Sequence, residues 1–334
     1  PESAGSTPRP ACYGRGGTRA TVTDAMAVCG WLGHSQMAYG QLQMDVDLAR
    51  KAVGELAGKL GRGLEDTAQA ILDIAVSEMF VEVEKLASRS GVDLRDFTLM
   101  PFGGGGPMLG AMLAREMGIR RVMAPRRPGV VSALGGLVAD LRGDFIRTTF
   151  LDLSENALRE LRQVLTELEA EGRSWLAAQV HDGALELLFS ADMRYAGQSY
   201  EIEVPIEAQW FERADLPAIQ AAFHRLHDAI YDFHDPEGRI EVVNLRLSAV
   251  GAGPALDFPE EVETTQEAIA QRTTPVFVNG ARRDIALFAR SDLHAGSLFE
   301  GPAVVAQEDT TFAIPTGVTA RVDRFLNLHL SFAE

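Results

Sequence analysis

A run of consecutive glycines is the feature of this sequence that most directly suggests a binding site. The run comprises Gly103, Gly104, Gly105 and Gly106, and Pro107 follows it. So many adjacent glycines lose more backbone entropy on folding than a simple turn requires, which favours a loop that another group approaches closely. An apolar run precedes the loop and a helical pattern follows it, so a ligand here would meet open backbone and the positive end of a helix. Tight packing of that helix on a sheet would explain the glycines equally well.

The glycine run matches neither of the two familiar phosphate-binding motifs. A Walker loop needs Lys and then Ser or Thr after its last glycine, whereas Pro107 and Met108 follow here. The dinucleotide fingerprint needs spaced glycines and a paired acidic residue, and the run does not provide them. The loop is therefore neither a Walker loop nor a Rossmann signature.

Asp24 is a second candidate, at the end of a segment rich in glycine and hydroxyl side chains. Its carboxylate could hold a metal ion or a water molecule beside a phosphate. A helical pattern begins at the same place, so Asp24 could instead cap that helix. Nearby Cys12 has no His or Cys partner at the spacing of a zinc site, which favours a structural thiol.

Three histidines form the cluster whose composition best suits a metal. His224 and His227 are three residues apart, which places both on one face of a helix, and His234 follows in the next loop. Aspartates at 228, 232 and 235 lie between and beside them. Amphipathic helices often carry His and Asp on their solvent-facing side, so the metal stays an open question. No pattern identifies a Ser-His-Asp or Cys-His hydrolase, and the catalytic residues remain unknown.

The elements that surround the glycines predict a βαβ unit. Apolar residues recur at helical spacing over 45–60 and 65–88, and the apolar run at 97–102 is short enough for a buried strand. A helical stretch at 108–117, a strand at Arg121–Ala124 and a helix at 129–138 come next. The order of strand, glycine loop, helix and strand is typical of an α/β sheet.

A change of pattern around 143–153 suggests a domain boundary, and we divide the chain into domains at 1–150 and 151–334. Ser154 is predicted to cap a long charged helix that extends to residue 180. The second domain is expected to be α+β with a β-rich end. Its other predicted elements are strands at Leu185–Tyr195, 200–205 and Ile240–Gly251, a helix at Leu216–Tyr231, a solvated connection at 252–272, and short strands from residue 275 onward.

Length, charge and cysteine content limit the class of protein. The chain has 334 residues, enough for about two domains, and its formal net charge is −16. A polyanion needs a basic surface, so we expect no nucleic-acid partner. Only two cysteines and no long apolar segment occur, which favours a soluble cytoplasmic protein without membrane contact. The chain opens with Pro1, and we expect it to be part of a longer protein.

Several separated segments resemble, in order, those of the hydantoinase A and 5-oxoprolinase family. The match recurs along nearly the whole chain, with two departures: Arg9 precedes Pro10, and Gly105 stands where the family usually has Ala. The matching segments are Pro1-Glu-Ser-Ala-Gly, Ala11-Cys-Tyr-Gly-Arg-Gly-Gly-Thr, Thr21-Val-Thr-Asp-Ala, Phe102-Gly-Gly-Gly-Gly-Pro, Pro128-Gly-Val-Val-Ser-Ala-Leu-Gly, Ala139-Asp-Leu-Arg, Arg194-Tyr-Ala-Gly-Gln-Ser-Tyr, Val243-Asn-Leu-Arg and Gly301-Pro-Ala-Val-Val.

This resemblance implies part of an actin-like ATPase lobe, followed by a β-rich carboxy-terminal domain. It also implies ATP and Mg²⁺ as cofactors, a hydantoinase B-like partner subunit and an oligomeric assembly. In the family a glycine loop receives the adenosine, which assigns that role to Gly103, Gly104, Gly105, Gly106 and Pro107. The family's phosphate loops usually lie upstream and are absent from this sequence.

The resemblance leaves the substrate open between two chemistries. The first is ring opening of a cyclic amide such as a hydantoin or 5-oxoproline, through phosphorylation of the amide oxygen. The second is activation of acetone or acetophenone for carboxylation. A third hypothesis, that the chain is a non-catalytic assembly module, needs no ATP hydrolysis. Whichever holds, we expect this chain alone to hydrolyse ATP poorly.

Overall fold

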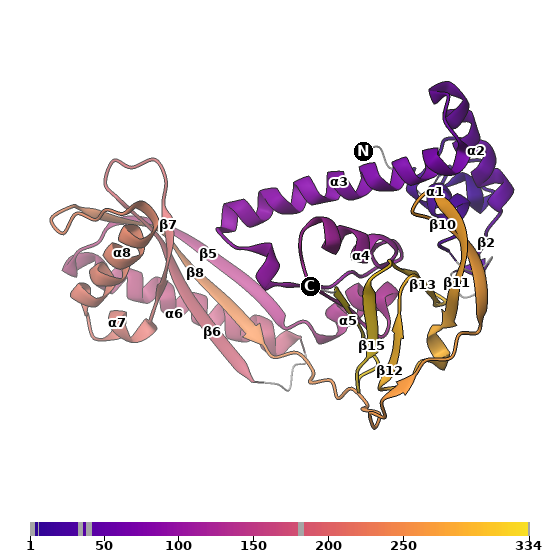
Figure 1. Cartoon of the computed structure of the whole chain (residues 1–334). Helices are drawn as coiled ribbons and strands as arrows, with labels where there is room; N and C mark the ends of the chain where they lie inside the picture. The colour runs from indigo at the N-terminus through magenta and orange to yellow at the C-terminus, as the bar shows by residue number, and fades with distance from the viewer. Residues whose placement is uncertain (1–3, 6, 33–35, 38–41, 180–183, 333–334) are drawn as a thin grey trace. The chain divides into compact units, whose positions relative to one another are not determined.

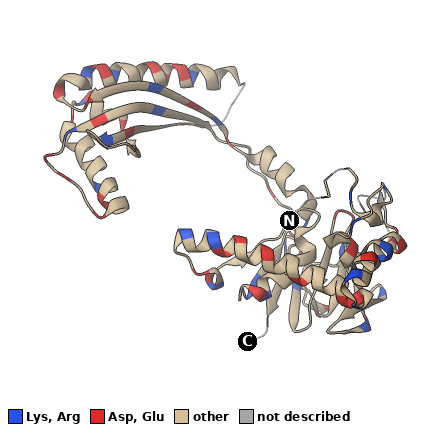
Figure 2. Ribbon diagram, turned by 90° about the horizontal axis from the view of Figure 1, so that it is seen from above, with Lys and Arg blue, Asp and Glu red and all other residues tan. Residues whose placement is uncertain are grey.

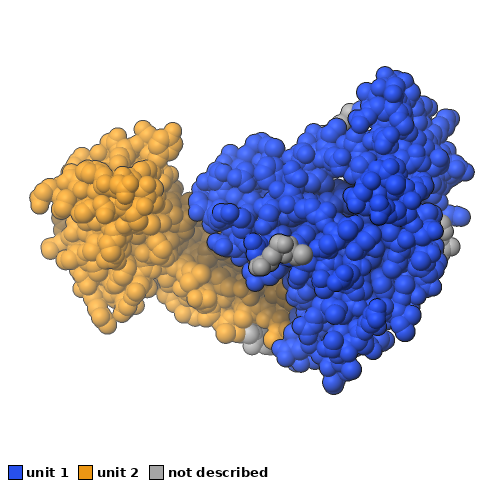
Figure 3. Space-filling view, in the orientation of Figure 1, with its two compact units in different colours: residues 1–134, 257–334 blue, residues 135–256 orange. Residues whose placement is uncertain are grey.

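The computed structural model describes residues 4–5, 7–32, 36–37, 42–179 and 184–332, which form two compact units. Unit 1 combines Pro1–Leu134 with Asp257–Glu334, and unit 2 is Gly135–Leu256 (Figure 3). These units divide the chain at other places than the sequence-based domains at 1–150 and 151–334. The reason is long-range strand pairing, which joins the last strand of the chain to the amino-terminal segment.

The helices of unit 1 begin and end where local signals predict. The Asp45 side chain caps α2 by accepting the N–H groups of Asp47 and Leu48, and Gly61 ends the helix in the left-handed conformation. The helices predicted at 45–60, 65–88, 108–117 and 129–138 are confirmed to within a few residues. The helices are α1 (Val22–Cys29), α2 (Val46–Leu60), α3 (Leu64–Ser90), α4 (Gly106–Glu116) and α5 (Val131–Val138), the last of which crosses the division between the units (Figure 1).

A six-stranded sheet of unit 1 carries the predicted βαβ arrangement. Strands β3 (Thr98–Leu99) and β4 (Arg121–Ala124) pair in parallel on either side of α4. Strand β4 also pairs antiparallel with β16 (Leu328–Phe332), which brings in the end of the chain. The order continues through β15 (Val318–Val322), β12 (Ser297–Glu300) and β9 (Gln266–Glu267). Parallel pairing on both sides of a helix confirms the βαβ unit.

A four-stranded sheet completes the core of unit 1. Its order is β10 (Arg272–Val278), β11 (Ala281–Ala289), β13 (Ala303–Ala306) and β14 (Thr311–Ile314). All four residues of β14 are buried, as are three of the four in β13. The hairpin formed by β13 and β14 is therefore fixed in the core, which gives a rigid base to the turn between them. A two-stranded sheet of β1 (Gln36–Met37) and β2 (Leu42–Gln43) is separate from both.

Unit 2 is an antiparallel sheet with helices packed on its core face (Figures 1 and 2). Ser154 caps α6 as predicted, by accepting the N–H of Ala157. The predicted end of that helix at Val180 lies outside the described residues. The strand order is β5 (Leu141–Asp152), β8 (Ile240–Gly251), β6 (Leu185–Tyr195) and β7 (Ile202–Ile206), and the helices are α6 (Glu155–Ala178), α7 (Ala208–Glu212) and α8 (Leu216–Tyr231).

The opposite face of this sheet is polar, because side chains alternate between the two faces of a strand. Arg246 and Asn244 both donate to the carboxylate of Asp192, which is 3% exposed. Arg194 pairs with Glu241 at 2.8 Å. Paired ions thus occupy one face while apolar side chains fill the other. Strand β5 was missed from the sequence, where only a change of pattern was visible, because most of its side chains are exposed and several are charged.

Candidate functional site

Three chain segments meet at the glycine loop of unit 1. The N–H of Gly103 donates to the carbonyl oxygen of Pro128 at 2.8 Å. The hydroxyl of Thr310 donates to the carbonyl oxygen of Gly104 at 2.9 Å. The N–H of Gly129 donates to Asp309 Oδ2 at 2.9 Å. Residues about 25 and 205 positions away along the chain therefore hold the glycine loop in place.

The glycines of the loop are needed for different reasons. Gly103 has a φ of 81°, which L side chains rarely adopt, so the backbone itself requires glycine there. A Cβ added at Gly104 would meet nothing closer than the Asp309 carbonyl oxygen at 3.8 Å, and one at Gly105 would meet only Met108 at 3.8 Å. At Gly106 the nearest atom, in Pro101, would be 3.6 Å away. The protein thus leaves room for side chains at three of the four positions.

Gly110, one turn further along α4, shows what a packing glycine looks like. A Cβ at this position would lie 2.7 Å from two side-chain carbons of Pro101. Such a contact requires the helix or the strand segment to shift. The close-packing explanation of glycine therefore applies to Gly110, and it does not account for Gly104, Gly105 or Gly106.

The start of α4 lies open beside the loop. Gly105 is the N-cap residue and provides no side-chain hydrogen bond, and a proline follows in the first turn of the helix. Within the described residues, the amides of Gly104 and Gly105 donate to no backbone acceptor. Open N–H groups and the helix dipole would favour a polar ligand at this point.

Asp309 adds negative charge to the same place. Its Oδ2 accepts from Gly129, but its Oδ1 is screened from solvent and has no hydrogen-bond partner among the described residues. A carboxylate repels phosphate oxygens and suits hydroxyl or amino donors. Neither Asp309 nor Thr310 was a sequence candidate. The sequence signal that could have found them was a pair of family-like segments. The segment 128–135 contains Pro128 and Gly129, and the segment 301–305 lies shortly before Asp309 and Thr310.

The carboxylate of Asp24, the second candidate, accepts hydrogen bonds from several nearby residues. The residue is buried, and its carboxylate accepts the N–H groups of Ala11 at 3.2 Å, Cys12 at 2.7 Å and Thr21 at 3.0 Å. The Thr21 hydroxyl also donates to it at 2.7 Å. Thr21 is the N-cap of α1, and the two side chains form a reciprocal capping box. The geometry matches the helix-capping alternative, with Thr21 as the cap residue itself.

Both thiols are buried and unreactive in character. Burial, reinforced by the charge of Asp24, raises the pKa of the Cys12 thiol far above its ordinary value. Burial raises the pKa of the Cys29 thiol to about 12. Because the thiolate is the reactive species, neither cysteine is suited to be a nucleophile at neutral pH.

The three histidines of unit 2 make separate hydrogen bonds. His224 Nδ1 lies 2.8 Å from the hydroxyl oxygen of Tyr195, and His234 Nδ1 lies 3.0 Å from Asp228 Oδ1. His227 is 3% exposed and contacts the carbonyl oxygen of Phe233 through Nδ1 and Gln198 through Nε2. The part of the chain that the structure describes contains no group of three His, Cys, Asp or Glu side chains arranged to hold a metal ion.

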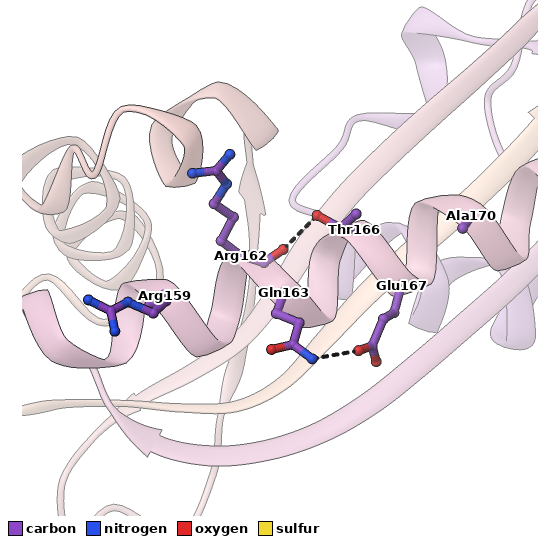
Figure 4. Close-up of a pocket in the computed structure, with 6 residues that line it drawn as sticks. All are labelled: Arg159, Arg162, Gln163, Thr166, Glu167 and Ala170. Atoms are coloured by element: carbon purple, nitrogen blue, oxygen red, sulfur yellow. Dashed lines mark hydrogen bonds between the residues drawn. The ribbon is translucent and has the colours of Figure 1, made fainter.

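Two surface hollows lie away from the glycine loop. One, of about 440 Å³, is lined only by the outer face of α6, where Gln163 donates to Glu167 and Thr166 donates to the backbone of Arg162 (Figure 4). The other, of about 370 Å³, lies in unit 1 beside α3 and α4. Its polar groups include Gln69, which donates to Asp73, and Arg115, which donates to the carbonyl of Thr316. The α6 hollow combines no groups from separate elements.

Across the residues described, no helix has the length and apolar character needed to cross a membrane. Comparison with known families gives two adjoining matches. The family described as hydantoinase/oxoprolinase matches residues 1–145, and that described as hydantoinase/oxoprolinase C-terminal domain matches residues 151–333. Together they cover nearly the whole chain.

Curated relatives match this chain with about half of their own length. An uncharacterized protein of Methanocaldococcus jannaschii is 36% identical over 97% of this chain and 46% of its own. The gamma subunit of acetophenone carboxylase from Aromatoleum aromaticum is 34% identical over 97% and 46%. The alpha subunit of caprolactamase from Pseudomonas jessenii is 28% identical over 97% and 48%.

Two solved structures resemble this one. The ATP-dependent caprolactamase of Pseudomonas jessenii has a TM-score of 0.75 at 28% identity and covers 100% of this chain and 50% of its own. A nucleotide-free acetone carboxylase has a TM-score of 0.82 at 21% identity and covers 97% and 48%. At that identity the second likeness concerns the fold alone.

Proposed function

Since this chain belongs to the hydantoinase/oxoprolinase family, we propose that it is the carboxy-terminal half of a subunit that uses ATP to open a cyclic amide. The likeness to an ATP-dependent caprolactamase over the whole chain supports both parts of the proposal, since caprolactam is a cyclic amide. The chain spans about half the length of the relatives it matches, so the complete subunit would carry the remaining machinery.

The proposed reaction makes a poor electrophile reactive. The amide oxygen attacks the γ-phosphorus of ATP, and ADP leaves with the electrons of the broken P–O bond. Water then adds to the activated carbon, and the ring nitrogen leaves with the electron pair of the C–N bond and takes up a proton released by that water. A second water hydrolyses the resulting acyl phosphate to a carboxylate and inorganic phosphate. Mg²⁺ enters as the ion that accompanies ATP and neutralises its phosphate charge. The described residues contain no group of three His, Cys, Asp or Glu side chains that could hold such an ion, and the proposal assigns it no ligand in this chain.

The single observation that carries the nucleotide assignment is the spare room at the glycine loop. Gly104, Gly105 and Gly106 keep no side chain although the protein would accommodate a Cβ at each. Open backbone of this kind would suit a ligand that contacts it directly, and the adenosine of ATP is the group we assign to Gly103, Gly104, Gly105, Gly106 and Pro107. On this proposal unit 1 is part of an actin-like ATPase lobe.

The complete enzyme would be heteromeric. Relatives that match this chain bear the names of alpha and gamma subunits, which supports a partner subunit here as well. We assign the partner to the hydantoinase B-like class, in which it would complete the hydrolytic step. The proposal places the assembly in the cytoplasm.

Calorimetry of ATP binding to the complete subunit tests the proposal. A Gly104→Ala change introduces a methyl group where the ligand is proposed to lie, so ATP affinity should fall by about tenfold. Gly58→Ala in α2 is the matched control, since a Cβ there meets nothing within 4 Å and the residue lies outside the glycine loop, and it should bind ATP like the wild type. Equal ATP affinity in the Gly104→Ala variant and the wild type would remove the adenosine assignment.

Ketone carboxylation is the second candidate, favoured by the 34% identity to an acetophenone carboxylase subunit. The two reactions differ in what ATP turnover requires. Turnover stimulated by lactams without bicarbonate supports ring opening. Turnover that needs bicarbonate and a ketone supports carboxylation. ATP binding without turnover in the complete, partnered enzyme would contradict both.

A further inference from the structure

The turn between β13 and β14 contacts both loops at the candidate site. This turn, residues 307–310, is closed by a hydrogen bond from the N–H of Gln307 to the carbonyl oxygen of Thr310 at 3.0 Å. The Gln307 side chain donates to the Arg126 carbonyl at 2.9 Å, and Asp309 accepts from Gly129. Thr310 donates to Gly104. One short turn therefore fixes the glycine loop and the segment 126–129 together.

The Thr310 contact sets the direction of a backbone donor. A trans peptide is planar, and its carbonyl and N–H point in opposite directions. Because the Gly104 carbonyl points at the Thr310 hydroxyl, the Gly105 N–H of the same peptide plane points away from the turn. That amide has no backbone acceptor within the described residues. The hydroxyl thus presents the amide to whatever occupies the space beside the loop.

The turn is well suited to this task because its base cannot move easily. Thr310 and Thr311 are both fully buried, and the strands that flank the turn belong to the core of unit 1. A glycine-rich loop has many accessible backbone conformations, so an outside contact is needed to select one. The core supplies that contact through Thr310.

We propose that Thr310 and Asp309 are positioning residues for the nucleotide whose adenosine is assigned to the glycine loop. The inference rests on the proposed function. Thr310 aims the Gly105 amide, and Asp309 fastens Gly129 while placing a carboxylate beside the loop. The negative charge of Asp309 repels phosphate oxygens and so disfavours the triphosphate at this position. The phosphates accordingly lie away from the β13–β14 turn.

Neighbouring threonines allow a matched test of positioning in the complete subunit. Thr311 is as buried as Thr310 and also donates to a backbone carbonyl, that of Leu32 at 3.3 Å. Thr310→Val should weaken ATP binding by about five- to tenfold, the effect of one lost hydrogen bond. Thr310→Ser should restore it, and Thr311→Val should leave it unchanged. Equal ATP affinities in the Thr310→Val and Thr311→Val variants would overturn the proposal.

Amide hydrogen exchange without nucleotide separates this inference from the proposed function. Thr310→Val should speed exchange of the Gly103 amide, which donates to the Pro128 carbonyl, by about fivefold, because the loop loses a contact that holds it in place, whereas Thr311→Val should not. Unchanged exchange in both variants would refute the positioning role whatever the ligand. Faster exchange only in Thr310→Val, with no ATP binding by the wild type, would support the positioning of the loop and defeat the proposed function.

Asp309→Asn tests which part of the nucleotide lies nearby. The asparagine carbonyl oxygen can still accept from Gly129, so the change removes charge and keeps the contact. If a nucleoside hydroxyl or amino group donates to Asp309 Oδ1, the asparagine loses that charge-assisted bond, and ATP affinity should fall by about three- to tenfold. A phosphate beside Asp309 would instead be relieved of repulsion, and ATP would bind about tenfold more tightly or better. That tightening would overturn the nucleoside assignment.

Discussion

Among the described residues, some polar groups lack hydrogen-bond partners at the glycine loop of unit 1, whereas the histidines of the unit 2 cluster form hydrogen bonds with their neighbours. At the loop, the Gly105 amide and Asp309 Oδ1 have no partner among the described backbone and side-chain acceptors and donors. In the cluster, His224 bonds with Tyr195 and His227 bonds with Phe233 and Gln198. Residue types that can bind ligands are abundant in both regions.

This difference indicates how a binding site can be told from a structural cluster. A buried polar atom without a partner in the described chain, such as Asp309 Oδ1, costs free energy that a ligand bonding with it would recover, and the exposed Gly105 amide is likewise available to a ligand. Groups that satisfy one another stabilise the fold and have little capacity left for a ligand. On this criterion the glycine loop is open, and the histidine cluster and the Asp24 turn are closed.

The largest loss of stability should come from removing the buried carboxylate of Asp24. Asp24→Ala removes a buried carboxylate that accepts from Ala11, Cys12 and Thr21 and leaves their N–H groups without partners. We expect unit 1 to lose about 3–5 kcal/mol of unfolding free energy. Chemical denaturation followed by fluorescence measures it. Asp24→Asn should lose less, since one acceptor oxygen remains. A phosphate or metal role would predict a stable variant with impaired ATP binding instead.

A somewhat smaller loss is expected at the centre of the histidine cluster. His227→Ala deletes a buried ring and its bonds to Phe233 and Gln198, so unit 2 should lose about 2–4 kcal/mol. Urea denaturation monitored through Trp175 and Trp210, both in unit 2, measures the change. ATP affinity should not respond. A fall in bound zinc or in ATP binding without destabilisation would mean that the cluster is a site after all.

Local patterns predicted most elements because the signals that define them are local. Asp45 and Gly61 delimit α2, and Ser154 starts α6, as their side chains and backbone preferences dictate. Strand β5 was not predicted because most of its side chains are exposed and several are charged, so its sequence lacks the apolar–polar alternation typical of a strand. The association of residues 257–334 with unit 1 depends on β16 pairing with β4, over two hundred positions apart. No local pattern reports such a pairing.

The candidate site was accessible from sequence only in part. A run of glycines indicates a backbone that needs glycine or is approached closely. Whether a ligand or helix packing explains the run depends on where Pro101 and Met108 lie in space. Asp309 and Thr310 act on the loop from a distant hairpin, and their residue types are common in turns. Only the contacts they make in the folded structure identify them as part of the candidate site.

Alanine at two glycines of α4 should separate an open position from a packed one. Gly110→Ala would drive a methyl group into Pro101, and overpacking should outweigh the gain in helix propensity by about 1–2 kcal/mol. Gly106→Ala, at the first residue of α4, places its Cβ no closer than 3.6 Å to Pro101 and should change stability by less than about 0.5 kcal/mol. Thermal unfolding of the two variants side by side gives the contrast. Equal destabilisation would mean that the whole loop is packed.

The smallest effect concerns the protonation of His224. Burial, with the nearby charge of His234, lowers the pKa of this ring below its ordinary value of 6.5, although Asp235 acts in the opposite direction. The folded state therefore favours the neutral ring, which bonds with Tyr195, more than the unfolded state does. The stability from this preference is complete above the ordinary pKa and is lost as the pH falls through the lowered one.

Unit 2 should accordingly become less stable as the pH falls below about 6.5, and the loss should level off once the folded ring is protonated as well. A His224→Gln variant should show a flatter dependence over the same range, since it cannot titrate. Urea midpoints at closely spaced pH values between about 5 and 7.5 give the measurement. An unchanged pH dependence in the variant would mean that His224 is as well solvated as a free histidine. The cluster would then be open at this point, and its contrast with the glycine loop would weaken.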